Sequence, residues 1–393
     1  MSRLRLISIV CFIFVFSWMR MSGQQKLRLI PTFENCSYYC DSVFDVTFDK
    51  AWNTSDVFRL LYKAKNESQW CEAFPPYYDI QRFQLRGSIM NLKENTEYDV
   101  RLEKKRKNKW ITVKKGDFVT WNSCPPIKRE WKLSELKEYK AGSGVVLKGM
   151  KGRADGWIKI IGDVPIEVSS TYRQALEVDD CRYLILENFV VKGGKIDAVA
   201  IRENCENVRI VGADISAWGR VAVDQVHLED SINYPAVKYK RDNACFIDEE
   251  GVVIRNDAGI YLGTVGKVPG PKDIVVERCY IHDPNGHSNA WHGTREIGRA
   301  KGISYRFWHP QGPQGIYMRS RGGLVIRYND VVGMDHHRLH DLLGGFNNGK
   351  IDGGMNTDAD VYGNYLAFSQ DDGLEMDGGQ CNIRLYNNRI EQV

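Results

Sequence analysis

The sequence predicts an all-β protein, in which a small β-sandwich precedes a right-handed parallel β-helix solenoid. Short strand-like runs separated by turn residues fill residues 25–124, a spacing typical of a sandwich. From about residue 145, β-branched runs recur with Gly and Asn between them. Such a recurrence is typical of a solenoid, whose coils cannot bury their apolar faces alone and stack into one continuous core. The chain has 393 residues, enough for both cores.

The first 23 residues have the pattern of a signal peptide. Arg3 and Arg5 precede an almost purely apolar run, 6–18, and Ser22-Gly23 provides a small-residue cleavage site. The run is short for a bilayer span, which needs about 20 residues. We therefore expect a secreted, periplasmic or cell-surface protein with no membrane span after signal removal.

Charge gives no reason to expect a nucleic-acid partner. Removal of the signal peptide takes away three arginines and no acid, which lowers the formal net charge from +4 to +1. Residues 24–124 then carry +4 and residues 125–393 carry −3. The basic run 104–107 lies between two strand-like segments, so we expect a solvated hairpin tip.

The sandwich is expected to span residues 24–124. Its predicted strands are Val43–Phe48, Val57–Ala64, Tyr98–Glu103, Trp110–Val113 and Asp117–Trp121. Leu92 and Tyr98 bracket a turn into a late strand, and this segment resembles the fibronectin type III pattern. The resemblance implies that Tyr98 forms a tyrosine corner.

The cysteines fall into two groups. The sandwich contains four, which in an oxidising compartment predict two disulfides in one of three connectivities: Cys36, Cys40, Cys71 and Cys124. Five more follow in the solenoid, and their odd number favours small buried hydrophobic residues: Cys181, Cys205, Cys245, Cys279 and Cys381.

Residues 125–144 are expected to form a linker and an N-terminal cap. Pro125-Pro126 marks the boundary, and Ser134 is positioned to N-cap a short helix over 135–139 that covers the open solenoid end. The solenoid itself is expected over 145–393. The strand-like segment 382–390 ends three residues before Val393, so we expect further coils beyond this chain end.

Internal repeats set the expected register. Segments 258–262, 314–318 and 372–376 align at Gly-to-Gly offsets of 56 and 58, interpreted as two or more coils with insertions. The segments that begin at Cys181 and Cys205 lie 24 residues apart, about one coil. Alternation places six side chains in the interior: Ile260, Leu262, Ile316, Met318, Leu374 and Met376. Asn388 and its counterparts suit turns and side-chain ladders. A leucine-rich repeat is excluded because Leu is sparse and helical segments are missing between strands.

Residues 145–393 resemble the pectate-lyase and polygalacturonase class of right-handed parallel β-helix proteins. More narrowly, they are similar to the "right-handed β-helix repeat" exported proteins of carbohydrate-degrading bacteria. The segments that carry the resemblance are 358–364, 370–379 and 382–388. Asn356-Thr357-Asp358 and Gln370-Asp371-Asp372 are similar to polygalacturonase motifs, whereas that family's later Gly-His-Gly and Arg-Ile-Lys motifs are absent. The resemblance implies a polysaccharide or oligosaccharide as partner.

Acidic residues near the C-terminus are the candidate catalytic groups: Asp371, Asp372, Glu375 and Asp377. Like charges on one strand face raise the pKa of at least one carboxyl, so that a neutral acid and an ionised base coexist. Glycosidic bond cleavage needs that pair. We therefore expect a glycoside hydrolase without a cofactor. The alternatives are that these acids are solvated, cap a turn or bind Ca²⁺.

Candidate substrate contacts come from one outward face and from long insertions. Tyr261 and Tyr317 are expected to share an outward column with Glu375, and Arg319 lies in the next column. The insertions supply the remaining candidates: His336, His337, His340, Trp291 and Trp308. Zinc is disfavoured because no His-Glu-x-x-His motif is present. A polysaccharide lyase using Arg319, Lys350 or His336, and a non-catalytic glycan-binding or adhesive protein, remain the alternative functions.

Overall fold

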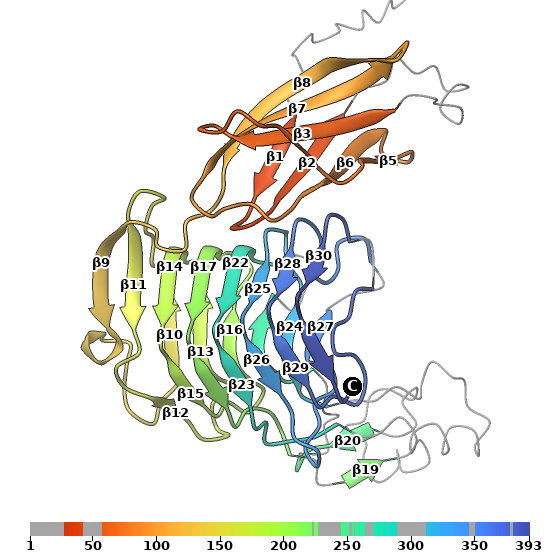
Figure 1. Ribbon diagram of the computed structural model, residues 1–393. Coiled ribbons are helices and arrows are strands. Elements are labelled where there is room, and N and C mark those ends of the chain that lie inside the picture. The colour runs from red at the N-terminus through yellow and green to blue at the C-terminus, as the bar shows by residue number, and fades with distance from the viewer. Residues whose placement is uncertain are drawn as a thin grey trace, which may run out of the picture.

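The protein is all-β in a computed structural model, with a small sandwich followed by a parallel β-helix (Figure 1). The structure describes residues 27–41, 57–221, 224–226, 245–250, 254, 256–263, 270–288, 312–345, 350–377 and 380–393. The predicted signal peptide, the predicted strand 43–48, Trp291 and Trp308 lie outside these ranges. Within them, no helix is long and apolar enough to cross a membrane.

Two four-stranded antiparallel sheets form the sandwich. The first has the order β1-β2-β6-β5, with β1 Arg28–Pro31, β2 Cys36–Asp41, β6 Gln84–Ile89 and β5 Tyr77–Asp79. The second has the order β4-β3-β7-β8, with β4 Cys71–Glu72, β3 Phe58–Ala64, β7 Glu97–Arg106 and β8 Lys109–Val119. The inward residues of both sheets share one core.

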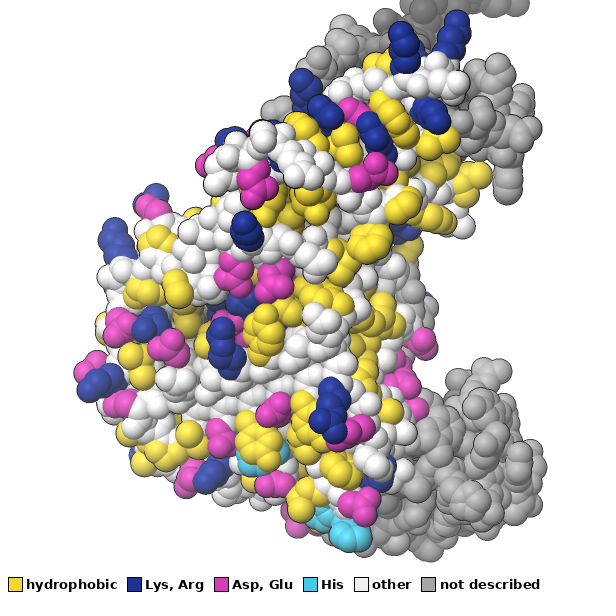
Figure 2. Space-filling model, in the orientation of Figure 1, with side chains coloured by type: hydrophobic (Ala, Val, Ile, Leu, Met, Phe, Trp, Pro, Cys, Tyr) yellow, Lys and Arg dark blue, Asp and Glu magenta, His cyan; other side chains and the backbone are white. Residues whose placement is uncertain are grey.

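The strand predictions hold for β3 and β7, and one correction concerns β8. Residues 110–113 and 117–121 were expected as two strands, but β8 runs on through Gly116 because a bulge at Leu102/Glu103 absorbs the irregularity. The basic run forms the β7–β8 hairpin, whose turn residues Lys107 and Asn108 both have positive φ. Figure 2 shows Lys and Arg side chains at the outer end of the sandwich, and both charge signs interspersed over the solenoid face drawn.

Tyr98 forms the expected corner. Its hydroxyl oxygen accepts a hydrogen bond from the Lys93 backbone N–H at 2.8 Å, and Leu92 and Tyr98 are both buried in the sandwich core. The tyrosine thus fixes the turn that leads into β7.

The four sandwich cysteines are not joined by disulfides in the structure. Cys36 and Cys40 are buried and Cys71 and Cys124 are exposed, all as free thiols. Cys36 and Cys40 lie four residues apart on β2, roughly 13 Å along a strand, whereas a disulfide joins Cα atoms less than about 7 Å apart. Both side chains belong to the sandwich core, where burial raises the pKa of the Cys40 thiol to about 11.

Three parallel sheets form the solenoid walls. Sheet I contains eight strands: β9 Ile127–Lys132, β11 Trp157–Ile161, β14 Arg182–Glu187, β17 Glu206–Val211, β22 Lys272–Glu277, β25 Val325–Arg327, β28 Asp360–Tyr362 and β30 Arg384–Tyr386. Sheet II contains seven: β12 Ile166–Glu167, β15 Val190–Lys192, β18 Asp214–Ser216, β23 Tyr280–His282, β26 Asp330–Val332, β29 Tyr365–Ala367 and β31 Arg389–Glu391. Sheet III contains six: β10 Val145–Lys148, β13 Gln174–Asp179, β16 Asp197–Ile201, β21 Ala258–Leu262, β24 Gln314–Met318 and β27 Leu343–Gly345.

The chain visits sheets I, II and III in turn, and each circuit is one coil. The 24-residue spacing is one coil, as expected, because Arg182 of β14 pairs with Glu206 of β17. The spacing of 56 is also one coil, because Ala258 pairs directly with Gln314, and its extra length is an insertion. The spacing of 58 spans two coils, since β27 lies between β24 and residues 372–376. A further insertion carries an antiparallel pair, β19 Asp224–Val226 and β20 Cys245–Ile247.

The solenoid begins earlier than expected. β9 lies within the predicted linker and pairs in parallel with β11. The predicted helix over 135–139 is not formed, and a single 3₁₀ turn, η2, spans Leu133–Glu135 in its place. Leu133 is fully buried against the first coil and covers the end of the core. This short turn therefore caps the solenoid in place of the expected helix.

The interior register is confirmed for four of the six expected residues. Ile260, Leu262, Ile316 and Met318 lie in the continuous solenoid core. Leu374 packs against that core while partly exposed, and Met376 is 38% exposed, contrary to the prediction. Residues 371–377 do not form a regular strand, so strict alternation fails there. Four of the later cysteines are buried as expected: Cys181, Cys205, Cys279 and Cys381; the side chain of Cys245 is not described.

An asparagine ladder fixes the corner between sheets I and II. The Asn364 side-chain oxygen accepts hydrogen bonds from the N–H and the side-chain amide of Asn329, at 3.0 and 2.9 Å. The Asn388 side-chain oxygen likewise accepts hydrogen bonds from the N–H and the side-chain amide of Asn364, at 3.1 and 2.9 Å. Each amide also donates to a backbone carbonyl of the preceding coil, so the turns are satisfied in series.

We expect the Ile260→Ala substitution to lower the free energy of unfolding by about 2–5 kcal/mol, because it opens a cavity in the stacked core. Met376→Ala removes an exposed side chain and should change it by less than about 0.5 kcal/mol. Denaturant titration of both variants checks this. An equal loss in the two variants would contradict the register.

The sandwich docks on sheet I (Figures 1 and 2). Phe33 of the sandwich packs with Val275, Val325 and Tyr362 of sheet I. Buried arginines extend from sheet I into the interface, and two of them pair with acids there. Arg327 bonds Glu277 at 2.5 Å and Glu94 of the sandwich at 2.6 Å, with its guanidinium 3.7 Å from the Phe33 ring centroid.

Arg384 makes the second such contact. It pairs with Asp360 and donates to the hydroxyls of Ser37 and Ser88 at 2.6 and 3.2 Å. The hydroxyl of Tyr39 bonds Asp358 at 2.6 Å nearby. The two domains are therefore joined by charged and aromatic contacts along four neighbouring coils.

Candidate acid–histidine site

An acid–histidine cluster lies at the edge of sheet III, formed by His340, Asp341, Asp371 and Glu375. His340 and Asp341 precede β27, and the His340 N–H bonds the Pro313 carbonyl just before β24. Residues 371–375 come one coil later and follow β27, since the Asp371 N–H bonds the His340 carbonyl. Stacking of successive coils thus brings two short segments, 31 residues apart, to one place.

The distances define a compact group. His340 Nε2 lies 3.4 Å from an Asp371 carboxylate oxygen and 3.8 Å from one of Asp341. Glu375 is anchored because its Oε2 accepts from the Gly345 N–H at 2.8 Å. Asp341 accepts from the Asp372 N–H at 3.2 Å. Every acid in the cluster is therefore positioned by the backbone or by the imidazole.

Gln314 closes the group on the other side of the ring. Its side-chain amide lies 3.3 Å from His340 Nδ1. Gly344 leaves the space for this arrangement, because a Cβ there would lie 1.8 Å from the Gln314 side-chain oxygen and 2.9 Å from an Asp341 oxygen. A side chain at residue 344 would thus displace both groups.

His340 is 5% exposed and Asp341 is 3% exposed. Burial alone would lower the pKa of His340, but Asp341, Asp371 and Glu375 outweigh it and the pKa is raised. These acids therefore favour the protonated form of the imidazole. The ligand atoms of His340, Asp341 and Asp371 also lie within 4.8 Å of one another and could hold a metal ion. A mixed nitrogen and oxygen set suits a first-row transition metal better than Ca²⁺, which takes oxygen ligands.

The cluster unites three sequence-predicted residues, His340, Asp371 and Glu375. Asp372 and Asp377 are exposed and belong to the same segment. Asp341 and Gln314 were missed. Asp341 directly follows His340 in the histidine-rich run, and Gln314 opens the repeated segment 314–318, so both signals were present in the sequence.

Tyr261 and Tyr317 share a column, as predicted, but they are not solvent-facing. They are 8% and 7% exposed, and their ring centroids lie 6.0 Å apart in a small buried cluster with Ala200 and Ala258. Gly344 occupies the next position in that column, where Glu375 was expected. These rings therefore do not line an open groove.

Several other candidates lie away from the cluster. Arg319 is buried and pairs with Asp352 at 2.7 Å. His336 and His337 are exposed on the turn after β26, where the rings of His337 and His287 stack at 5.5 Å. The Asn356–Asp358 motif lies at the start of β28 in sheet I, and Asp358 is covered by the sandwich. The two motifs similar to those of polygalacturonases are thus on different sides of the coil.

A second buried acid continues this edge of sheet III toward earlier coils. Asp197 accepts from the Gln174 amide at 3.1 Å and from the Ala258 N–H at 3.3 Å. Burial raises the pKa of Asp197 to about 7, and the charge of Asp257 adds to this rise. Asp257 itself forms a two-pronged pair with Arg220 at 2.6 and 2.9 Å.

The raised pKa of Asp197 predicts a pH dependence of stability. The native state holds a proton that the unfolded state, with a pKa near 3.8, releases. The stabilising contribution is fully present below about pH 4 and is lost as the pH rises through about 7. We expect Asp197→Asn to gain stability relative to the wild type over this range, in denaturant titrations at a series of pH values. A difference that stays constant with pH would contradict the assignment.

No protein-family model matches the sequence, and no curated protein matches it either.

Proposed function

We propose that the protein is a secreted carbohydrate-active enzyme, a glycoside hydrolase whose chemistry takes place at the acid–histidine cluster. The observation that carries the proposal is the convergence of His340, Asp371 and Glu375 at the edge of sheet III, with Asp341 behind them. Glycosidic cleavage needs one carboxyl as acid and a second as base or nucleophile. The tyrosine corner supports the finer assignment of the sandwich as fibronectin type III-like. The stacked coils support the assignment of the solenoid as a pectate-lyase-like, right-handed β-helix.

In the proposed reaction the two acids have different roles. Asp371, whose carboxylate oxygen lies 3.4 Å from His340 Nε2, serves as base or nucleophile. Glu375, held through one oxygen by the Gly345 N–H, takes up a proton from solvent before the reaction and then protonates the glycosidic oxygen as the bond to the anomeric carbon breaks. Water then adds its hydroxyl to the anomeric carbon. Its proton passes to Glu375 if Asp371 is the nucleophile, or to Asp371 if Asp371 is the base, in which case exchange with solvent restores both acids.

A hydrolase is preferred to a lyase because the lyase candidates are scattered. Arg319 is paired with Asp352, whereas Lys350 and His336 are exposed, and within the described residues neither has a hydrogen bond or ion pair to the cluster. A lyase requires a base and a cation beside one uronate. Three acids around one imidazole match the acid–base pair of hydrolysis better.

A panel screen tests the proposal. The mature protein is incubated with plant and algal polysaccharides, and reducing ends and the ultraviolet absorbance of unsaturated products are measured in parallel. We expect reducing ends to appear without the absorbance. Absorbance that rises with the reducing ends would indicate a lyase. Binding with neither signal would indicate an adhesive protein. Loss of activity on chelation would show that the trio of His340, Asp341 and Asp371 works through a metal.

A further inference from the structure

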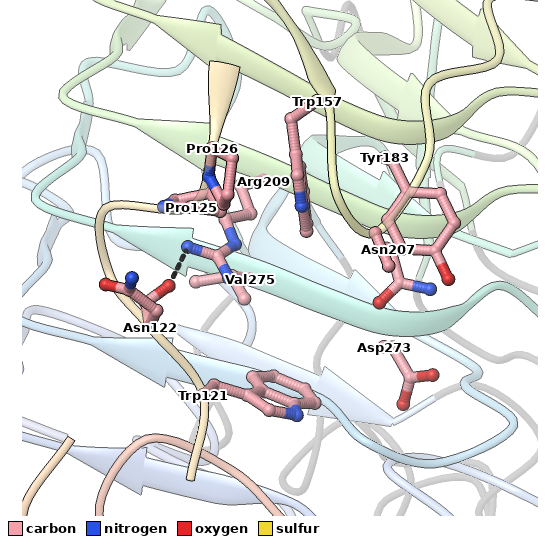
Figure 3. A pocket seen from close by; sticks show the side chains of 11 residues that line it. Trp121, Asn122, Pro125, Pro126, Trp157, Tyr183, Asn207, Arg209, Asp273 and Val275 are labelled. Carbon is pink, nitrogen blue, oxygen red and sulfur yellow. Dashed lines mark hydrogen bonds between the residues drawn. The ribbon is translucent and has the colours of Figure 1, made fainter. Parts of the chain in front are cut away.

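A pocket of about 290 Å³ opens between the sandwich and the solenoid, on the outer face of sheet I (Figure 3). Its walls come from both domains. Trp121 follows the last sandwich strand, Pro125 and Pro126 belong to the connection, and Trp157 begins β11. The pocket is therefore formed only when the two domains are docked.

The solenoid side of this pocket is made by an unusual backbone feature. Tyr183, Asn207 and Asp273 occupy equivalent positions on three successive coils and have φ of 50°, 54° and 54°. This left-handed conformation interrupts the strand alternation, and all three side chains lie along one side of the pocket (Figure 3). Asn and Asp tolerate the conformation well, whereas a bulky Tyr does so at a cost.

Three aromatic rings give the pocket apolar faces. Trp157 and Tyr183 pack edge to face with centroids 5.4 Å apart, and Trp121 lies across the pocket from them (Figure 3). Trp121 is held by an edge-to-face contact with Phe33 at 5.4 Å. Rings fixed in this way present flat apolar surfaces without a cost in side-chain entropy when a ligand stacks on them.

The pocket has three main polar side chains. Arg209 is engaged in contacts within the wall, whereas Asn207 and Asp273 lie at the rim. Arg209 bonds the carbonyls of Asn122 and Ser123 at 2.9 and 3.2 Å and lies 4.5 Å from the Trp157 ring centroid, so it holds the wall together. Asp273 pairs with Lys272 at 3.2 Å. Among the described residues, no hydrogen bond from the Asn207 side-chain amide is found, and that amide lies on the pocket wall beside Asp273.

We propose that this pocket binds one neutral pyranose unit of a glycan, stacked on the tryptophan rings and hydrogen-bonded through Asn207 and Asp273. A pyranose has apolar C–H faces and a rim of hydroxyls that both donate and accept, which matches flat rings beside an amide and a carboxylate. The volume is at the lower end of small-molecule pockets, so it suits a single ring. The charged residues of the lining are one acid, Asp273, and one arginine, Arg209, so the lining has no excess charge to select a uronate, a phosphate or a cation.

The matched variants are Asn207→Gly and Asn188→Gly. Both residues have positive φ, 54° and 57°, so glycine fits either backbone without strain. Asn188 is exposed and is not among the residues that line the pocket. Trp121→Ala removes one wall, and its unfolding curve shows whether the docked domains stay intact.

Binding is measured by the change in intrinsic tryptophan fluorescence on titration with trisaccharides of glucose, mannose and galacturonic acid, with tetramethylammonium as a cation probe. All proteins carry Asp371→Asn, so that the result does not depend on hydrolysis. We expect a neutral trisaccharide to bind, with affinity unchanged in Asn188→Gly and reduced about fivefold or more in Asn207→Gly. Trp121→Ala should abolish binding while remaining folded. No response to either neutral sugar, tighter binding of the galacturonate or the cation, or equal affinity in Asn207→Gly and Asn188→Gly would each overturn the proposal.

Discussion

Asp371→Asn and Glu375→Gln are expected to reduce kcat by at least about 10²-fold each, with little change in the thermal midpoint. Removal of a positioned acid or base typically costs 10²–10⁴-fold. In either variant Asp341 stays 3.8 Å from His340 Nε2, so the buried imidazole keeps a carboxylate partner. The measurement is reducing-end release under saturating substrate, together with a melting curve for each variant.

Aryl glycosides separate the two roles. A leaving group that departs without protonation should restore much of the rate in Glu375→Gln and none in Asp371→Asn, because only the first variant lacks the acid. Asp335→Asn is the matched control, since Asp335 is an exposed acid that pairs with Arg338 outside the cluster. Full activity in both cluster variants would place the chemistry elsewhere.

Arg327→Ala is expected to lower the free energy of unfolding by about 3–5 kcal/mol, the usual cost of removing one partner from a buried ion pair. Arg327 is 1% exposed, and its loss removes the buried hydrogen-bond partner of Glu277, which keeps the charges of the exposed Arg278 at 3.2 Å and of Arg209. It also removes a bond to Glu94 that joins the domains. Denaturant titration measures the change.

A double variant distinguishes the buried charge from lost packing. Arg327→Met with Glu277→Gln removes both charges and retains most of the volume, so it should recover a large part of the loss. Arg389→Ala breaks an exposed pair with Glu391 and should change the stability by less than about 0.5 kcal/mol. An Arg327→Ala curve that superimposes on the Arg389→Ala curve would show that the interface pair contributes nothing.

The fold was predictable because the signals for it are local. The Leu92–Tyr98 turn produces a tyrosine corner, and the repeats at 258–262 and 314–318 align in the pairing register that the sequence indicates. The number of coils between the repeats could not be predicted because some coils carry insertions. An extra loop and an extra coil lengthen a repeat equally, and only the pairing of β27 between the two later repeats distinguishes them.

The candidate site was predictable only in part. His340, Asp371 and Glu375 stood out as a histidine run and an acidic run, but their contact depends on coil stacking. Arg327 and Glu277 read as ordinary outward residues of a strand, which are normally solvated. Docking of the sandwich buries these two side chains, and no local sequence pattern predicts that burial. Tyr261 and Tyr317 show the reverse case, in which an outward column is nonetheless buried.

A crystal structure of the Asp371→Asn variant with an oligosaccharide of its best substrate would locate the bond that is cleaved. If hydrolysis takes place at the acid–histidine cluster, a glycosidic oxygen lies within about 2.6–3.2 Å of the Glu375 carboxyl, with the anomeric carbon facing residue 371. An oligosaccharide bound with its glycosidic bonds remote from Glu375 and His340, in a crystal whose sheet III edge is open to solvent, would contradict it.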